Sequence, residues 1–297
     1  QPGREIPKRP ELMRLFPGYY TLKKYPGSYE NSNTGQLIRG IRMKIFKNAC
    51  IPIILSLAIC LVADTSKAGN DRFEQAKKHL DDGIHTYNEQ LMHDAKKIFL
   101  QLIKENPSDY IYVHYVALTH LGLCDLKNFE IAQSTEKKVK KDLKAKRVAI
   151  AEEGLPFADK SIELNDNFSE SYRVRGALIS NRISGMVSGM RNGSLAEEDI
   201  DIALQIDNNN AMAHIENARK FINTPGLFGG DINKGIEILN NVIKDNSGLG
   251  KGYINLGIAY RENDEVEKAV NTFKHLLEIN PGNPEAVFYL DKLMFSK

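Results

Sequence analysis

The sequence lacks the residue combinations on which many enzymes and metal proteins depend. It contains no Gly-x-Ser-x-Gly, His-Glu-x-x-His or Cys-x-x-Cys motif, which excludes the usual nucleophile elbow, zincin helix and paired-cysteine site. His120 and Cys124 are four residues apart on one predicted helix face, but two ligands do not make a closed metal site and no second pair is evident. We therefore expect a protein that is not an enzyme and needs neither a cofactor nor a metal ion.

The chain is also poor in cysteine and in long hydrophobic runs. Its three cysteines are Cys50, Cys60 and Cys124, and the first two lie beside or within an apolar run over residues 51–63. If that run is removed, Cys124 has no disulfide partner in the chain. As a helix the run would be about 20 Å long at ~1.5 Å per residue. That is too short for a bilayer core of about 30 Å.

The residues around this run are typical of an export signal. Lys44 and Lys47 precede it, and the small residues Ser66 and Ala68 follow at the spacing that signal peptidase recognises. We therefore expect a signal peptide over 43–68, cleaved after Ala68, and a mature protein in the periplasm or cell envelope. An uncleaved N-terminal anchor is the alternative. Residues 1–42 are rich in Pro, Gly and Tyr without periodicity, and we interpret them as a disordered leader or as upstream translation before Met43.

Excess charge of one sign is confined to the N-terminal part of the chain. The formal net charge is +2, yet residues 1–68 hold eleven basic and four acidic side chains, so the remainder is acidic. An acidic body behind a basic leader argues against nucleic acid as a partner.

The clearest positive feature is a repeat motif in residues 253–281. Large residues, small residues and a closing proline follow the helix–turn–helix spacing of the tetratricopeptide repeat, and the chain resembles that superfamily. The positions are Tyr253, Leu256, Gly257, Tyr260, Ala269, Phe273 and Pro281. Gly257 and Ala269 lack bulk where the two helices cross, while Phe273 fills the space around them.

Weaker copies of the pattern fill most of residues 69–297. Repeat one has Gly83, Ala95 and Phe99 in the same register. We predict an all-α, right-handed superhelix of about five such hairpins, with a terminal capping helix over 284–295. Two irregularities are expected: a long basic inserted helix over about 125–153, and about eight extra residues between the two helices of repeat three, around 185–193.

The connection before the second helix of repeat four supports a narrower resemblance. The segment Pro-Gly-Leu-Phe-Gly-Gly-Asp at 225–231 is similar to that of exported bacterial helical-repeat proteins, including the periplasmic tetratricopeptide component of TRAP-type solute transporters. Asp231 is expected to cap the following helix. The resemblance implies a non-catalytic scaffold for protein–protein interaction, with an accessory ligand-binding transporter component as the alternative.

Repeat arrays of this kind bind along the concave face, which the first helix of each hairpin lines. Carried over position by position, the resemblance implies a partner-binding groove of Tyr87, His114, Leu118, Arg173, Ser180, Arg219, Lys251, Ile254 and Arg261. Its cations could pair with carboxylates or phosphates. The expected partner is an acidic protein or peptide segment, or a small anionic organic ligand. A homo-oligomer formed through the convex face or the long inserted helix is also expected.

Overall fold

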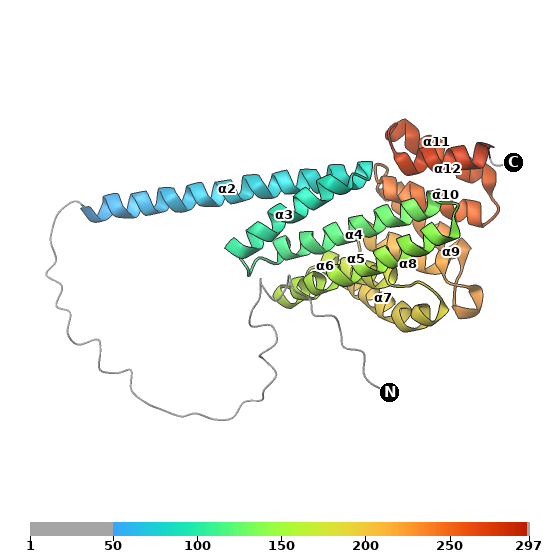
Figure 1. The fold of residues 1–297 in the computed structure, drawn as a ribbon, viewed down its shortest axis with the longest axis horizontal. Helices are drawn as coiled ribbons and strands as arrows, with labels where there is room; N and C mark the ends of the chain where they lie inside the picture. Colours follow the sequence, from blue (N-terminus) through green and yellow to red (C-terminus); the bar gives the residue numbers. More distant parts are fainter. Residues whose placement is uncertain (1–49, 296–297) are drawn as a thin grey trace, which may run out of the picture. The chain divides into compact units, whose positions relative to one another are not determined.

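The structure, a computed structural model, describes the backbone of residues 50–295 and the side chains from residue 68 onward. The chain divides into two compact units, residues 1–72 and 73–297. Every regular element among the described residues is helical (Figure 1). The helices are α2 (Cys50–Thr86), α3 (Glu89–Glu105), α4 (Tyr110–Gln133), α5 (Lys137–Leu164), α6 (Ser169–Asn181), α7 (Met186–Ile206), α8 (Ala211–Asn223), the short 3-10 turn η1 (Gly226–Phe228), α9 (Ile232–Asp245), α10 (Gly250–Glu262), α11 (Val266–Ile279) and α12 (Pro284–Phe295).

The second unit is a stack of helical hairpins, which confirms the predicted all-α repeat architecture. The pairs are the end of α2 with α3, α4 with α5, α6 with α7, α8 with α9, and α10 with α11, and α12 closes the stack. Ring contacts of Phe73 with Phe99 and Tyr115 pack the end of α2 against α3 and α4. The helix boundaries follow the sequence signals: Asp231, for example, caps α9 by accepting a hydrogen bond from the Lys234 N–H, as predicted.

The small residues of the motif allow the two helices of each hairpin to approach closely. A Cβ atom on Gly257 would lie 2.5 Å from Cζ of Phe273, and one on Gly83 would lie 2.9 Å from Cγ of Met92. Real side chains do not come this close, so a larger residue at either position would have to displace its neighbour. The predicted role of Gly257 at the crossing of α10 and α11 is confirmed.

The extra residues of repeat two form no separate helix, so the predicted insertion over 125–153 is corrected. They lengthen both members of the hairpin instead, giving α4 24 residues and α5 28, joined by the short turn 134–136. The long hairpin is visible in green in Figure 1. Leu143 and Ile150 are half-buried on α5, whereas Val139, near the turn, is 41% exposed.

The expected spacer in repeat three is also helical. Residues 186–193 form the first two turns of α7, because Ser188 satisfies the backbone at the helix start. Its hydroxyl accepts from the Gly185 N–H and donates to the Gly185 carbonyl. The three glycines of this stretch favour a loop, but a hydrogen-bonded start is enough to hold them in a helix.

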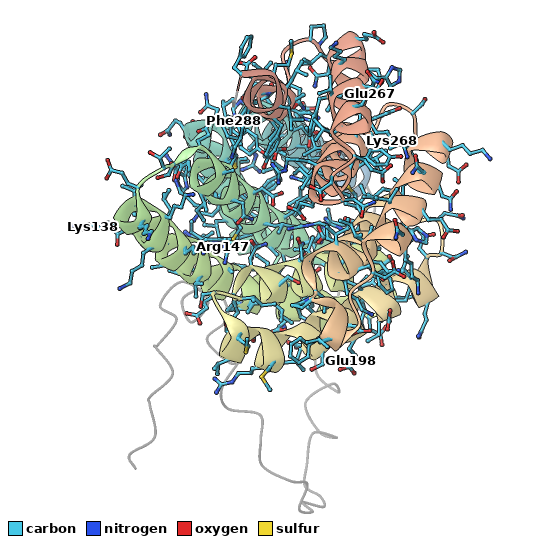
Figure 2. All side chains as sticks on the ribbon, turned by 90° about the vertical axis from the view of Figure 1, so that its right-hand side faces the viewer. Lys138, Arg147, Glu198, Glu267, Lys268 and Phe288 are labelled. Carbon is cyan, nitrogen blue, oxygen red and sulfur yellow. The ribbon has the colours of Figure 1, made fainter. Side chains whose placement is uncertain are left out.

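The long hairpin reaches the last repeat. At the far end of α4, Asp125 accepts a hydrogen bond from Lys251 of α10 at 3.0 Å. One turn further, Phe129 stacks on Tyr87 at 4.7 Å and meets the ring edge of Phe288 in α12 at 5.6 Å. Viewed along the array, the helices of the second unit therefore form a ring, with the hairpin α4–α5 meeting the C-terminal helices (Figure 2).

The predictions for the N-terminal region concern residues that the structure leaves largely undescribed. The leader over 1–42, residues 43–49 of the predicted signal peptide and the side chains of the apolar run lie outside the described residues. Within the described part of the chain, no helix combines the length and apolar character needed to cross a membrane.

Candidate binding groove

The ring of hairpins encloses one large groove of about 910 Å³. The name "the groove" refers to this space from here on. Its walls come from α4 to α8, η1, α10 and α12, so helices far apart in sequence face one another across it. The lining side chains used below are Asp125, Asn128, Arg147, Ser180, Asn181, Ile183, Met186, Met190, Glu216, Arg219, Phe228, Lys251, Ile254, Glu285 and Tyr289.

Four of the predicted groove residues line this space. Ser180, Arg219, Lys251 and Ile254 all belong to its walls, as expected from their positions on α6, α8 and α10. Their role in binding stays a prediction.

Three other predicted residues do not line the groove. Tyr87 is half-buried at the turn between α2 and α3; burial raises its pKa, and the hydrogen bond of its hydroxyl to Glu285 contributes to the same shift. Arg261 sits over the ring of Tyr289 at 5.2 Å and pairs with Glu262 at 3.1 Å. Leu118 is half-buried in α4.

His114 and Arg173 do not face the groove, and their predicted place is corrected. His114 is buried against Phe168 and 3.4 Å from the Ser171 hydroxyl. Arg173 is only 2% exposed and pairs with Glu170, with 2.8 Å between its Nη2 and Oε2 of Glu170. His114 belongs to α4 and Arg173 to α6, and the packing of these two helices against each other buries both side chains.

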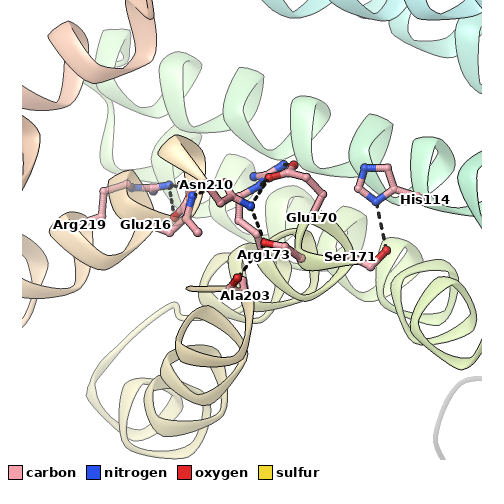
Figure 3. Close-up of polar contacts among 10 residues, drawn as sticks. His114, Glu170, Ser171, Arg173, Ala203, Asn210, Glu216 and Arg219 are labelled. Carbon is pink, nitrogen blue, oxygen red and sulfur yellow. Dashed lines mark hydrogen bonds and ion pairs between the residues drawn. The ribbon is translucent and has the colours of Figure 1, made fainter. Parts of the chain in front are cut away.

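Arg173 and Glu170 belong to a polar cluster that joins repeats three and four (Figure 3). The Asn210 amide donates to Glu170 at 2.8 Å and to the Ser169 hydroxyl at 2.8 Å. Ser169 in turn donates to the Ala203 carbonyl, and the Asn210 oxygen caps α8. Every charge in this cluster has a partner, so it positions the two hairpins and offers no free group to a ligand.

The four predicted groove cations all pair with carboxylates of the chain itself. Arg219 contacts Glu216 at 2.9 Å, and Lys251 contacts Asp125 at 3.0 Å, while Arg173 and Arg261 have the partners given above. Whether these cations also pair with a carboxylate or phosphate of a partner stays a prediction. A cation that is already paired attracts an acidic partner less strongly, because a new carboxylate must compete with the one already present.

Arg147 is a groove cation that the sequence reasoning missed. It ends the lysine-rich stretch of α5, a pattern typical of a solvated helix face. Its spacing from Leu143 and Ile150 nevertheless places it on the apolar stripe of that helix, a signal that is present in the sequence. In the structure it lines the groove and donates to Asn128 Oδ1 at 2.9 Å.

The beginning of α7 forms an apolar lip on the groove. Met186 and Met190 are both 74% exposed, and Phe228 of η1 is 61% exposed. Gly189 lies between the two methionines, and a Cβ there would meet only Ile183, at an ordinary 3.7 Å. Flexible methionines suit a surface that adapts to its ligand, and packing does not account for the glycine.

Metal and thiol chemistry find no support in the described part of the chain. No three His, Cys, Asp or Glu side chains gather there around a common point. Cys124 is buried, its thiol lies 3.6 Å from the Arg147 carbonyl, and burial raises its pKa. A buried thiol of this kind is unreactive.

Comparison with known proteins supports the fold. No protein-family model and no curated protein matches the sequence. Among solved structures, TTC0263, a thermophilic TPR protein in Thermus thermophilus, is similar with a TM-score of 0.55 and 14% identity, over 74% of this chain and 98% of that one. The human IFIT1 dimer with m7Gppp-AAAA is similar with a TM-score of 0.52 and 13% identity, over 69% of this chain and 42% of that one. Identities this low show the fold alone: an array of tetratricopeptide-type hairpins.

Proposed function

We propose that this chain is a non-catalytic scaffold of the cell envelope that holds a short segment of a partner protein in its groove. The fold is one whose solved examples are tetratricopeptide proteins, which supports a role in protein interaction. The observation that carries the proposal is the groove itself, about 910 Å³ in volume and walled by helices from four different hairpins and α12.

The shape of the groove favours a short segment over a long one. The contact of Lys251 with Asp125 and that of Phe129 with Phe288 join the long hairpin to the last repeat and α12. An extended chain cannot pass through the groove on the side of these two contacts without breaking them, whereas a chain end or a narrow loop can enter the groove. The comparisons give no support to the alternative of a transporter component, and the export signal remains an expectation.

Filling the groove should abolish capture of the partner. Gly189→Phe adds a ring beside Ile183 at a position where a Cβ fits, so the protein should fold and lose binding. The full chain and this variant are used as bait for solubilised cell envelope, and each captured protein is then retested in purified form.

The matched control is Val187→Phe, which adds the same ring two residues away. Val187 is exposed and does not line the groove. A partner that binds the wild type and the control but not Gly189→Phe supports the proposal. Equal binding to both variants would contradict it.

A second candidate role follows from the lysines of α5. Lys137, Lys138, Lys140, Lys141, Lys144 and Lys146, here the lysine ridge, are exposed except for the half-buried Lys140. None lies within ion-pair distance of a carboxylate among the described residues. Lysines at a helix N-terminus oppose the helix dipole, so stability does not explain them. Figure 2 shows Lys138 at the outer edge of the molecule.

Such a ridge suits an anionic lipid surface, where each lysine contributes about 1 kcal/mol of attraction. The full chain should sediment with vesicles containing anionic lipid at low salt and remain in solution at high salt. Replacing Lys137, Lys138 and Lys141 by Gln should weaken sedimentation by about tenfold or more. Replacing Lys78, Lys97 and Lys104 by Gln serves as the control. Equal losses of sedimentation for the two triple variants would rule out the lysine ridge as the lipid-binding surface.

A further inference from the structure

Arg147 differs from the other cations of the groove in having only neutral partners. Nη1 donates to Asn128 Oδ1 at 2.9 Å, and Nη2 donates to the backbone carbonyl of Ile183. Nε is buried and has no acceptor. No carboxylate of the described residues lies within ion-pair distance of this guanidinium, whereas Lys220, Arg219 and Lys251 each contact one.

A cation placed in this way leaves an uncompensated positive potential in the groove wall. Burial lowers the pKa of Arg147, and the neighbouring charge of Arg219 lowers it further. Desolvating a charge without a counter-charge is costly, and arginine remains ionised in proteins. An anion entering the groove therefore finds one guanidinium whose charge no other group has neutralised.

The surroundings of Arg147 indicate what the rest of the ligand is like. Ile183, whose carbonyl holds the guanidinium, also lines the groove, and Met186 and Met190 follow within two turns. On the polar side, Asn128 and Asn181 are hydrogen-bonded to each other at 3.0 Å and fix the position of Nη1. The site thus presents one oriented cation at the edge of an apolar wall.

We propose that Arg147 binds the carboxylate of a ligand whose adjoining part is apolar and lies against the lip formed by α7. The proposal rests on the groove being the binding site, as proposed above. The same chemistry has two sources: a free aliphatic carboxylate, or the terminal carboxylate of a peptide that ends in apolar residues.

Four probes separate these sources, with binding to the full chain measured by calorimetry. They are octanoate, octanol, an acetylated trileucine peptide with a free carboxylate, and the same peptide as its amide. Octanoate and the free peptide should bind at least about tenfold more tightly than their uncharged counterparts, because a hydrogen bond to a charged group is the stronger one.

Four variants assign the effect to Arg147. Arg147→Gln should weaken the binding of octanoate by about tenfold or more, and Arg147→Lys should weaken this binding less. Arg182→Gln is the matched control, because Arg182 lies nearby at the end of α6, pairs with Glu152 and does not line the groove. Gly189→Phe should abolish binding by filling space instead of removing charge. Unfolding transitions like that of the wild type verify that each variant is folded.

The outcomes distinguish this inference from the proposed function. If octanoate binds through Arg147 and neither peptide binds, the inference stands and the peptide role falls. If both peptides bind equally, the scaffold role stands and the inference is overturned. Equal losses for Arg147→Gln and Arg182→Gln, or no binding of any probe, also overturn it.

Discussion

Replacing Phe273 with Ala is expected to lower the free energy of unfolding by about 3–5 kcal/mol. The ring is 0% exposed and stacks on Tyr289 with 5.6 Å between centroids. It also fills the space over Gly257, which no other side chain can occupy. Chemical denaturation followed by far-ultraviolet circular dichroism measures the effect.

The same contact can be tested from its other side. Gly257→Ala pushes a methyl group into the ring and should cost about 1–3 kcal/mol. Adding Phe273→Leu to Gly257→Ala should cost less than the sum of the two single changes, because the smaller side chain makes room. Val266→Ala, on the exposed part of α11, should change stability by less than about 0.5 kcal/mol. If the stability losses of Gly257→Ala and Phe273→Leu simply add in the double variant, α10 and α11 do not pack closely at these two residues.

Acidification is expected to destabilise the fold because two histidines are buried in their neutral form. Burial lowers the pKa of His114 to about 4 and that of His120 to about 3, whereas an unfolded histidine titrates near 6.5. As the pH falls below about 6.5, the two histidines bind protons in the unfolded state but not in the folded state. The folded state therefore loses stability between about pH 6.5 and about pH 4. Together the two residues should cost about 3–4 kcal/mol between about pH 7 and about pH 5.

Replacing both residues should remove this loss. His114→Gln keeps a polar group near Ser171, and His120→Leu suits a side chain whose ring nitrogens have no partner. Unfolding of the double variant at a series of pH values should show a flat response between about pH 7 and about pH 5. His275→Gln, at an exposed position, should keep the wild-type response. A double variant that retains the full acid loss would assign it to other groups.

The repeats were predictable because their signal is local. Gly257, Ala269 and Phe273 meet across a single hairpin, so their spacing alone implies the contact that the structure shows. The pairing of Arg219 with Glu216 is readable in the same way, since residues three apart share a helix face.

The closing of the array was not predictable from such spacing. Lys251 and Asp125 are 126 residues apart, and the meeting of Phe129 with Phe288 depends on the length of α4. Both contacts arise from the accumulated curvature of the whole array, which no single motif encodes. Contacts between hairpins likewise bury His114 and Arg173 and place Arg147 in the groove wall.

Hydrogen–deuterium exchange tests the central claim most directly, which is that partners bind in the groove. The full chain is compared with and without a segment of a captured partner. We expect slower exchange in residues 183–193 and 250–258, which form opposite walls of the groove. Protection confined to α9 and α11 would place the binding surface elsewhere and contradict the account.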